Sequence, residues 1–221
     1  MTIEYFSIGH PFTGIRSYFA YKVRQRLFYL FIRAMQPTPT STILDLGVTQ
    51  ENSLLESNFF EKTYPYKDKI IAAGIEDASF LQRSYPGLQF VRIQPGTLPF
   101  ADNQFDILFC SAVLEHVGNC ESQRNFVRES IRVARQFFFT TPNRQFPVDF
   151  HTFLPFLHWL PQSIHQKALR RLGLDFWSKT ENLNLLTPRA LRGLFPSCTS
   201  LHVYEHKLFG LPSNIVVYGR K

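Results

Sequence analysis

The sequence predicts an α/β protein in which a parallel sheet is covered by helices on both faces. Short, continuously apolar runs alternate along the chain with helical stretches, which is typical of strands buried on both faces. Acidic or small residues follow where several of these runs end, and parallel sheets bind ligands beyond the carboxyl ends of their strands. Hydrophobic residues make up 44% of the 221 residues, enough for a buried core. We therefore expect one domain, residues 1–221, with a ligand site at one edge of its sheet.

The first expected element is a helix over Ile15–Met35, within an N-terminal helical cap of residues 1–40. This stretch has no glycine or proline inside it after residue 14, and prolines follow it at positions 37 and 39. Its charges are all positive, and three fall on one ridge at helical spacing: Lys22, Arg26 and Arg33. Either the helix caps the domain with this ridge in solvent, or it lies on a membrane surface or covers a hydrophobic acceptor.

Five strands should follow, because each of five segments is short and apolar and is bounded by turn residues or prolines. These segments are Thr42–Leu46, Lys69–Ile75, Leu88–Ile93, Phe105–Ser111 and Gln136–Thr141. A helix is expected over Glu121–Ala134, where apolar residues recur at near-helical spacing.

The segment from about 146 to 180 breaks this rhythm with prolines, histidines and aromatic rings. We predict a helical insertion beside the site, suited either to a lid over an apolar acceptor or to extra core. A helix over Thr187–Phe195 should follow it, with Thr187 as N-cap and Pro188 at the first position. Two closing strands are expected at Leu201–Leu208 and Ser213–Gly219.

Charge and cysteine content narrow the class of protein. Lys and Arg number 24 and Asp and Glu 17, a formal charge of +7, which favours acidic partners or reflects a solvated basic surface. The three cysteines lack CxxC spacing, so we expect no zinc or redox motif and no metal site.

No secretory pattern is seen and no apolar run approaches the ~18 residues that span a bilayer. This predicts a cytoplasmic protein, with peripheral membrane contact through the basic helix as an alternative.

Candidate binding residues follow the expected strands. Asp45 and Gly47 come at the end of the first strand, where a glycine lets the backbone approach a ligand closely. Glu76 follows the second strand, where a carboxylate can accept both hydroxyls of a ribose, and Asp77 can serve as a helix N-cap. Capping and solvation are the alternative roles for both acids. Two more segments at such positions are the apolar loop Gly96–Phe100 and the stretch Ser111–Val117.

The order of these motifs resembles that of class I S-adenosylmethionine (SAM)-dependent methyltransferases. The resemblance is carried by ILDLG at 43–47, the acid after the second strand, LPFADNQFDILFCSAVLEHV at 98–117 and TTPN at 140–143. It covers roughly Ser41 to Asn143 and is most similar to the type 11 group, which includes quinone-biosynthesis C-methyltransferase-like proteins. The resemblance implies a Rossmann-like three-layer sandwich with a seven-stranded, mostly parallel sheet whose last strand is antiparallel.

The resemblance also implies that SAM is the cofactor and that it lies across the carboxyl ends of the strands. The implied cofactor-binding residues are Asp45, Gly47, Val48, Thr49, Glu76, Asp77, Gly96, Thr97, Leu98, Ser111 and Ala112. One departure bears on this site: the family pattern DxGxGxG has Thr49 and Glu51 in place of two glycines. Either the loop follows another path, or SAM binding is weak or lost.

Methyl transfer to oxygen or carbon is helped by a general base, and histidine is the usual one near neutral pH. His151 and His116 are the candidate catalytic residues; a structural hydrogen bond is the alternative role of His116. Asn143, Arg144 and His151 are the candidate substrate-binding residues, with Arg144 suited to an acidic group.

We expect methyl transfer from SAM to an unidentified small-molecule or lipid-like acceptor. The alternatives are an RNA-directed methyltransferase, which the basic charge favours, and a non-catalytic binding protein on the same fold, which the altered glycine loop favours. Against RNA, the chain lacks an Asp/Asn-Pro-Pro-aromatic motif and a Pro-Cys nucleophile.

Overall fold

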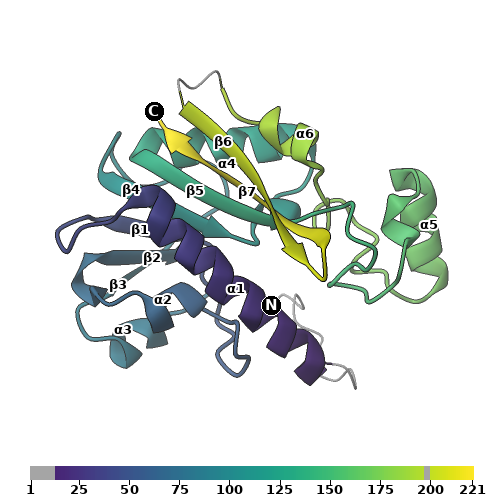
Figure 1. Cartoon of the computed structure of the whole chain (residues 1–221), viewed down its shortest axis with the longest axis horizontal. Coiled ribbons are helices and arrows are strands. Elements are labelled where there is room, and N and C mark those ends of the chain that lie inside the picture. The colour runs from purple at the N-terminus through teal and green to yellow at the C-terminus, as the bar shows by residue number, and fades with distance from the viewer. Residues whose placement is uncertain (1–12, 197–199) are drawn as a thin grey trace.

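The computed structural model describes residues 13–196 and 200–221, and its centre is a seven-stranded sheet (Figure 1). The strands are β1 (Ile43–Leu46), β2 (Ile70–Gly74), β3 (Gln89–Arg92), β4 (Phe105–Ser111), β5 (Ala134–Pro142), β6 (Ser200–Leu208) and β7 (Leu211–Arg220). Their order is β3-β2-β1-β4-β5-β7-β6. β1 to β5 pair in parallel, whereas β7 runs antiparallel to both of its neighbours. The predicted seven-stranded sheet with an antiparallel last strand is thus confirmed.

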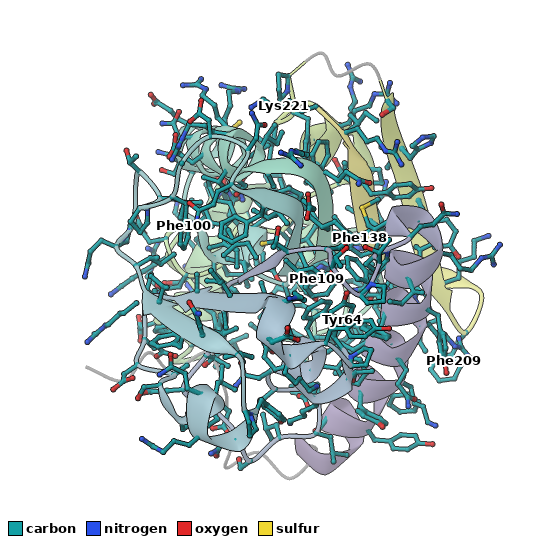
Figure 2. The ribbon with its side chains drawn as sticks, turned by 90° about the vertical axis from the view of Figure 1, so that its left-hand side faces the viewer. Tyr64, Phe100, Phe109, Phe138, Phe209 and Lys221 are labelled. Atoms are coloured by element: carbon teal, nitrogen blue, oxygen red, sulfur yellow. The ribbon has the colours of Figure 1, made fainter. Side chains whose placement is uncertain are left out.

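Helices cover both faces of the sheet (Figure 1). The α-helices are α1 (Thr13–Met35), α2 (Phe59–Thr63), α3 (Phe80–Ser84), α4 (Cys120–Val133), α5 (Gln162–Arg171) and α6 (Pro188–Arg192), and the 3-10 helices are η1 (Lys67–Lys69), η2 (Leu114–His116) and η3 (Leu157–Trp159). Because side chains alternate along a strand, β5 supplies both cores. Phe138 packs on the side of α1, α2 and α3 (Figure 2), whereas Phe137 and Phe139 pack on the side of α4 and α6.

Helix α1 packs against the sheet through a stripe of side chains that recur every four residues. The buried members are Val23, Leu27, Phe31 and Met35. Phe31 is fully buried and makes edge-to-face contacts with Phe60, Phe109 and Phe138 at centroid distances of 5.3, 5.2 and 5.4 Å. The predicted ridge of Lys22, Arg26 and Arg33 is exposed. Packing against the core therefore uses one face of the helix, and these three charges face away from it.

The segment predicted as an insertion contains η3 and α5, and α5 projects from the body of the molecule (Figure 1). It has a small core of its own around Leu169, Trp177 and Leu183. Among the described residues, no helix is both long and apolar enough to cross a bilayer.

Element boundaries agree closely with the sequence where the local signals are strong. β4 has the predicted limits, and the Thr187 side chain caps α6 by accepting a hydrogen bond from the backbone N–H of Ala190, with Pro188 at the first position. α4 was predicted over Glu121–Ala134 and spans Cys120–Val133. β5 begins directly after it, so no loop separates the helix from the strand.

Candidate functional site

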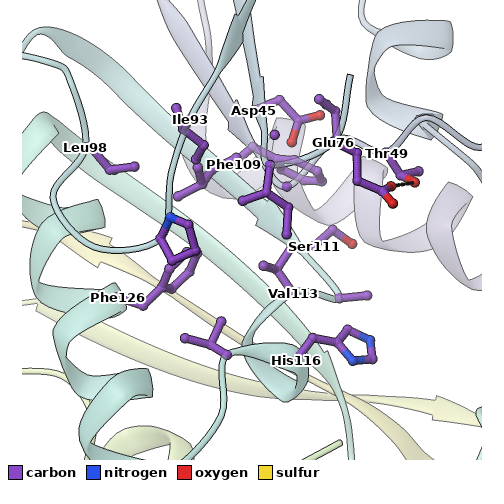
Figure 3. Close-up of a pocket in the computed structure, with 18 of the residues that line it drawn as sticks. Asp45, Thr49, Glu76, Ile93, Leu98, Phe109, Ser111, Val113, His116 and Phe126 are labelled. Atoms are coloured by element: carbon purple, nitrogen blue, oxygen red, sulfur yellow. Dashed lines mark hydrogen bonds between the residues drawn. The ribbon is translucent and has the colours of Figure 1, made fainter. Parts of the chain in front are cut away.

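A cavity of about 1090 Å³ opens at the carboxyl ends of the central strands (Figure 3). Eleven of the predicted site residues line it: Asp45, Gly47, Val48, Thr49, Glu76, Gly96, Thr97, Leu98, Ser111, Ala112 and His116. They come from the ends of β1, β2 and β4 and from the loop that follows β3. Ligand pockets commonly enclose about 300–1,000 Å³. The cavity is therefore large enough for a nucleoside cofactor together with part of an acceptor.

The first turn of the cavity depends on Gly47. Its φ is +112°, a value that side-chain-bearing residues rarely adopt. The backbone N–H groups of Gly47 and Val48 both donate to the carbonyl of Ala73, at 2.7 and 3.2 Å, which draws the chain across the end of β2. A Cβ at position 47 would lie 2.1 Å from a methyl carbon of Val113. This turn thus requires glycine on two independent grounds.

The altered part of the loop is held by side chains instead of glycines. Asn58 accepts a hydrogen bond from the Thr49 N–H at 3.0 Å, and its amide donates to the carbonyls of Thr49 and Glu51 at 2.9 and 3.1 Å. Neither Thr49 nor Glu51 is among the described residues with positive φ. The loop therefore takes a path on which glycine is not needed at these two positions, one of the two outcomes predicted from the sequence.

The two acids after β2 point to different places. Glu76 lines the cavity, and its Oε2 accepts from the Thr49 hydroxyl at 2.9 Å (Figure 3). Asp77 is exposed and accepts from the backbone N–H of Ser79 at 2.9 Å. Among the described residues that line the cavity, Asp77 does not appear. The structure thus brings Glu76 to the predicted site and leaves Asp77 outside it.

The loop after β3 forms the apolar side of the cavity and is anchored by one arginine. Arg132, at the end of α4, donates to the carbonyls of Leu98 and Phe100 at 3.0 and 2.8 Å and pairs with Glu129 at 3.0 Å. Glu129 in turn accepts from the Leu98 N–H at 3.1 Å. The apolar wall consists of Ile93, Leu98, Val113 and Phe126 (Figure 3). Such a wall suits the flat face of an adenine ring.

Three charged side chains meet at the other end of the cavity: Arg24 from α1, Asp45 from β1 and Glu61 from α2. Glu61 is completely buried with its carboxyl hydrogen-bonded to that of Asp45, and neither of its oxygens accepts from an N–H or hydroxyl group among the described residues. Burial raises the pKa of Glu61, and burial together with the neighbouring Glu61 carboxyl raises the pKa of Asp45 well above its ordinary value. Burial lowers the pKa of Arg24, and the charges of four nearby carboxyl groups act in the opposite direction and raise it.

Sequence reasoning missed Arg24 and Glu61. Arg24 was grouped with the other positive charges of its helix, although it lies off their ridge. Glu61 stands between aromatic and basic residues in FFEKT, and an acid next to a buried apolar pair was the available signal.

Histidines and small polar groups form the remaining end of the cavity. The Ser111 and Thr140 hydroxyls lie 2.8 Å apart, and Ala112 has a φ of +58°, which is uncommon outside glycine. His116 Nδ1 lies 2.6 Å from the carbonyl oxygen of Asn182. Burial, reinforced by nearby His151, lowers the pKa of His116 to about 3. The imidazole of His116 is therefore neutral at physiological pH.

His151 stands next to His116 but outside the lining of the cavity. The two ring centroids are 5.0 Å apart. His151 Nδ1 lies 2.9 Å from Asp149 Oδ1, and the Thr152 hydroxyl donates to the other oxygen of Asp149 at 2.7 Å. Hydrogen bonds with His151 and Thr152 hold the pKa of Asp149 below its ordinary range despite burial. His151 is therefore paired with a buried carboxylate two residues before it in the chain.

The other two candidate substrate residues are engaged elsewhere. Asn143 is buried, and its amide donates to Glu205 at 2.9 Å. Arg144 donates to the carbonyls of His158 and Leu160 at 3.0 and 2.9 Å, which ties the insertion to the end of β5. The structure does not bring Asn143 or Arg144 into the cavity.

Comparison with known proteins gives the class. Residues 69–136 match the type 11 family model of the methyltransferase domain. Magnesium protoporphyrin IX methyltransferase from Synechocystis PCC 6803, solved with bound SAH, has a TM-score of 0.58 at 11% identity, over 97% of this chain and 89% of that one. The PH0226 protein from Pyrococcus horikoshii OT3 has a TM-score of 0.57 at 16% identity, over 98% of this chain and 95% of that one. The N-methyltransferase NodS from Bradyrhizobium japonicum WM9, in complex with SAH, has a TM-score of 0.53 at 11% identity, over 96% of this chain and 89% of that one. No curated protein matched.

The matched segment runs from β2 to β5 and includes most of the cavity-forming loops. Together with the strand order, it supports the class predicted from the sequence: residues 69–136 match a methyltransferase domain, and the chain has the fold of class I SAM-dependent methyltransferases. The narrower likeness to quinone-biosynthesis enzymes stays a prediction.

Proposed function

We propose that the protein transfers the methyl group of SAM to a small-molecule or lipid-like acceptor. One observation carries this proposal above the others. A single cavity joins an acidic end at Asp45 and Glu61, the ribose candidate Glu76, an apolar wall and a neutral histidine, His116. SAM supplies an electrophilic methyl group on a sulfonium whose departure needs no acid catalyst. The protein therefore has to bind, align and exclude water.

One feature of the cavity fits the cofactor independently of any family pattern. Glu61 is buried with its carboxyl against that of Asp45, and a buried pair of carboxyls is destabilising until a cationic ligand joins it. The methionine part of SAM carries an ammonium beside its sulfonium.

The charges also have the pattern that SAM requires. Asp45 and Glu61 would hold the ammonium, and Arg24 would hold the carboxylate of the methionine part. Glu76 would accept the ribose hydroxyls, and the wall around Leu98 would receive the adenine. We assign the other lining residues Val48, Thr49, Gly96, Thr97, Ser111 and Ala112 to the same cofactor, as predicted from the sequence.

His116 and His151 are the proposed catalytic side chains. His116 is neutral and lines the cavity, so it can accept a hydrogen bond from the acceptor, and His151, which is paired with Asp149, stands beside it as the candidate base. An apolar acceptor is supported by the insertion, where Phe156 and Trp159 are about half exposed. The exposed ridge of α1 would provide peripheral contact with an anionic membrane.

Calorimetric titration of the intact protein with SAM and S-adenosylhomocysteine tests the cofactor assignment. We expect one site, and a ligand at 100 times its Kd should stabilise the fold by about 2.7 kcal/mol. Absence of binding at millimolar ligand would favour the non-catalytic alternative. Incubation with methyl-labelled SAM and a cell extract, followed by phase separation, tests the acceptor. Label in the organic phase or among small molecules supports the proposal, whereas label in RNA would overturn it.

A further inference from the structure

Glu115, His116 and His151 form a cluster that methyl transfer by itself does not explain. Each offers one ligand atom, and these atoms lie within 4.8 Å of one another. Glu115 and His116 belong to η2, after β4, whereas His151 lies in the loop that follows β5. Because parallel strands β4 and β5 are neighbours, their following segments meet at the same edge of the sheet. The cluster therefore sits at the end of the cavity that His116 lines.

Both imidazoles are oriented by an acceptor on Nδ1. In His116 this acceptor is the carbonyl of Asn182 at 2.6 Å, and in His151 it is the carboxylate of Asp149 at 2.9 Å. A neutral imidazole that donates from Nδ1 carries its lone pair on Nε2. For His116, Nε2 lies 4.0 Å from Glu115 Oε1. Metal-binding histidines show this arrangement, with the second nitrogen bonded to a carboxylate or backbone carbonyl.

The carboxylate of Glu115 points to a missing partner. Its side chain is completely buried, and Oε2 accepts from the Thr141 hydroxyl at 2.8 Å. Oε1 has no hydrogen-bond partner within the described residues. Leaving such an atom buried and unsatisfied is costly, and a cation between Glu115 and the histidines would satisfy it.

We propose that Glu115, His116 and His151 bind one divalent transition-metal ion at the acceptor end of the cavity. Two imidazoles and one carboxylate, without a thiolate, suit Zn²⁺, Mn²⁺, Fe²⁺ or Co²⁺, and three protein ligands leave a coordination position open. Ligand atoms that share Zn²⁺ at about 2.1 Å in tetrahedral geometry lie roughly 3.4 Å apart. The separation of His116 Nε2 from Glu115 Oε1 is 4.0 Å and the cluster as a whole lies within 4.8 Å, so side-chain rotations have to draw the ligand atoms together when the ion binds.

The open position gives the cluster a role that rests on the proposed function. A divalent ion lowers the pKa of a hydroxyl that coordinates it. The acceptor oxygen then releases its proton to solvent and forms a bond to the methyl carbon while the carbon–sulfur bond breaks, and S-adenosylhomocysteine leaves. In this reaction His116 and His151 act through the ion, and the acceptor class is one that presents an oxygen.

Metal titration of the whole chain tests the site without SAM or an acceptor. Protein stripped with a chelator is titrated with Zn²⁺ by calorimetry and with Co²⁺ by visible absorption, and one ion per chain is expected at micromolar concentrations. His116→Gln and His151→Gln should each weaken binding by at least about 100-fold, because loss of an orienting partner alone costs about 10–100-fold. Asp149→Asn removes only the orienting partner of His151, so it should weaken metal binding by about 10–100-fold. His202→Gln is the matched control, since His202 is exposed on β6, and it should bind as the wild type does.

A measurement on the wild type guards against variants that do not fold. In ¹⁵N-histidine NMR, Zn²⁺ should shift the Nε2 resonances of two of the 7 histidines. No binding at micromolar Zn²⁺ and Co²⁺, or equal binding by wild type and both histidine variants, overturns the metal site. These outcomes leave SAM binding untouched, whereas absence of SAM binding with an intact metal site would remove the proposed function alone.

Discussion

Replacing Glu61 by glutamine should separate the stability of the empty protein from its affinity for SAM. Glu61 is completely buried on α2 with its carboxyl against that of Asp45, and neither of its oxygens accepts from an N–H or hydroxyl group in the described part of the chain. A buried polar group left unsatisfied costs about 1–3 kcal/mol, and more when it is charged. Glutamine keeps the shape of the side chain and removes its ionisation.

The sign of the effect depends on pH. Burial raises the pKa of Glu61 above its ordinary value of 4.5, although Asp45, Lys67 and Arg24 act against this. A group with a raised pKa binds more protons folded than unfolded, so stability falls as pH rises from about 4.5 through the raised pKa. We expect Glu61→Gln to match the wild type near pH 4.5 and to be the more stable protein at pH 8, in urea unfolding, by about the 1–3 kcal/mol that an unsatisfied buried polar group costs.

The same substitution should weaken SAM binding, because the carboxylate is proposed to hold the ammonium. A hydrogen bond to a charged group contributes about 1.5–3 kcal/mol, which corresponds to roughly a 10- to 150-fold rise in Kd measured by calorimetry at pH 8. Glu181→Gln is the control, since Glu181 lines the same cavity but is exposed. A Glu61→Gln protein that binds SAM like the wild type, and whose stability follows the same pH curve, would refute this reasoning.

Three further experiments test the turn at Gly47, the loop after β3 and the basic ridge of α1. Gly47→Ala should lower the free energy of unfolding by more than about 2 kcal/mol and weaken SAM binding, because the added Cβ clashes with Val113 and position 47 also has a positive φ. Gly173→Ala is the control, since Gly173 has a φ of +74° but no atom within 4 Å of an added Cβ. It should lower the free energy of unfolding by only about 1 kcal/mol. Equal losses would contradict the clash. Arg132→Gln removes the hydrogen bonds to the carbonyls of Leu98 and Phe100 and should raise the Kd for SAM several-fold in calorimetry. An unchanged Kd would show that this loop does not contact the adenine of SAM. Arg26→Glu combined with Arg33→Glu should reduce co-sedimentation with anionic vesicles at low salt, and equal pelleting of the variant and the wild type would contradict a membrane contact through α1.

Much of the fold is predictable from the sequence because its signals are local. The continuous apolar run of β4 gives both of its limits, and Thr187 followed by Pro188 marks the start of α6. The cavity residues at the ends of β1, β2 and β4 were predictable for a related reason. In a parallel sheet the carboxyl ends of all strands lie at one edge, so residues such as Asp45, Glu76 and Ser111 must converge.

The direction of an individual side chain was less predictable. Asp77 follows Glu76 directly, but the chain turns there and Asp77 bonds the backbone of Ser79 outside the cavity. Arg144 follows β5, where an acceptor residue was expected, and instead ties down the insertion through two carbonyls. The loop with the replaced glycines was also not predictable, because Asn58, whose side chain hydrogen-bonds to the backbone of Thr49, belongs to no sequence motif.

By itself the sequence determined the order of strands and helices along the chain, the class of the domain and the edge of the sheet at which the cavity opens. These follow from the periodicity of neighbouring residues and from the topology that such a pattern permits. Only the tertiary structure decided that Arg24, Asp45 and Glu61 meet at one end of the cavity, and that Glu115, His116 and His151 gather at another. The physical reason is that each group joins side chains from separate elements, and their meeting depends on how those elements pack in space.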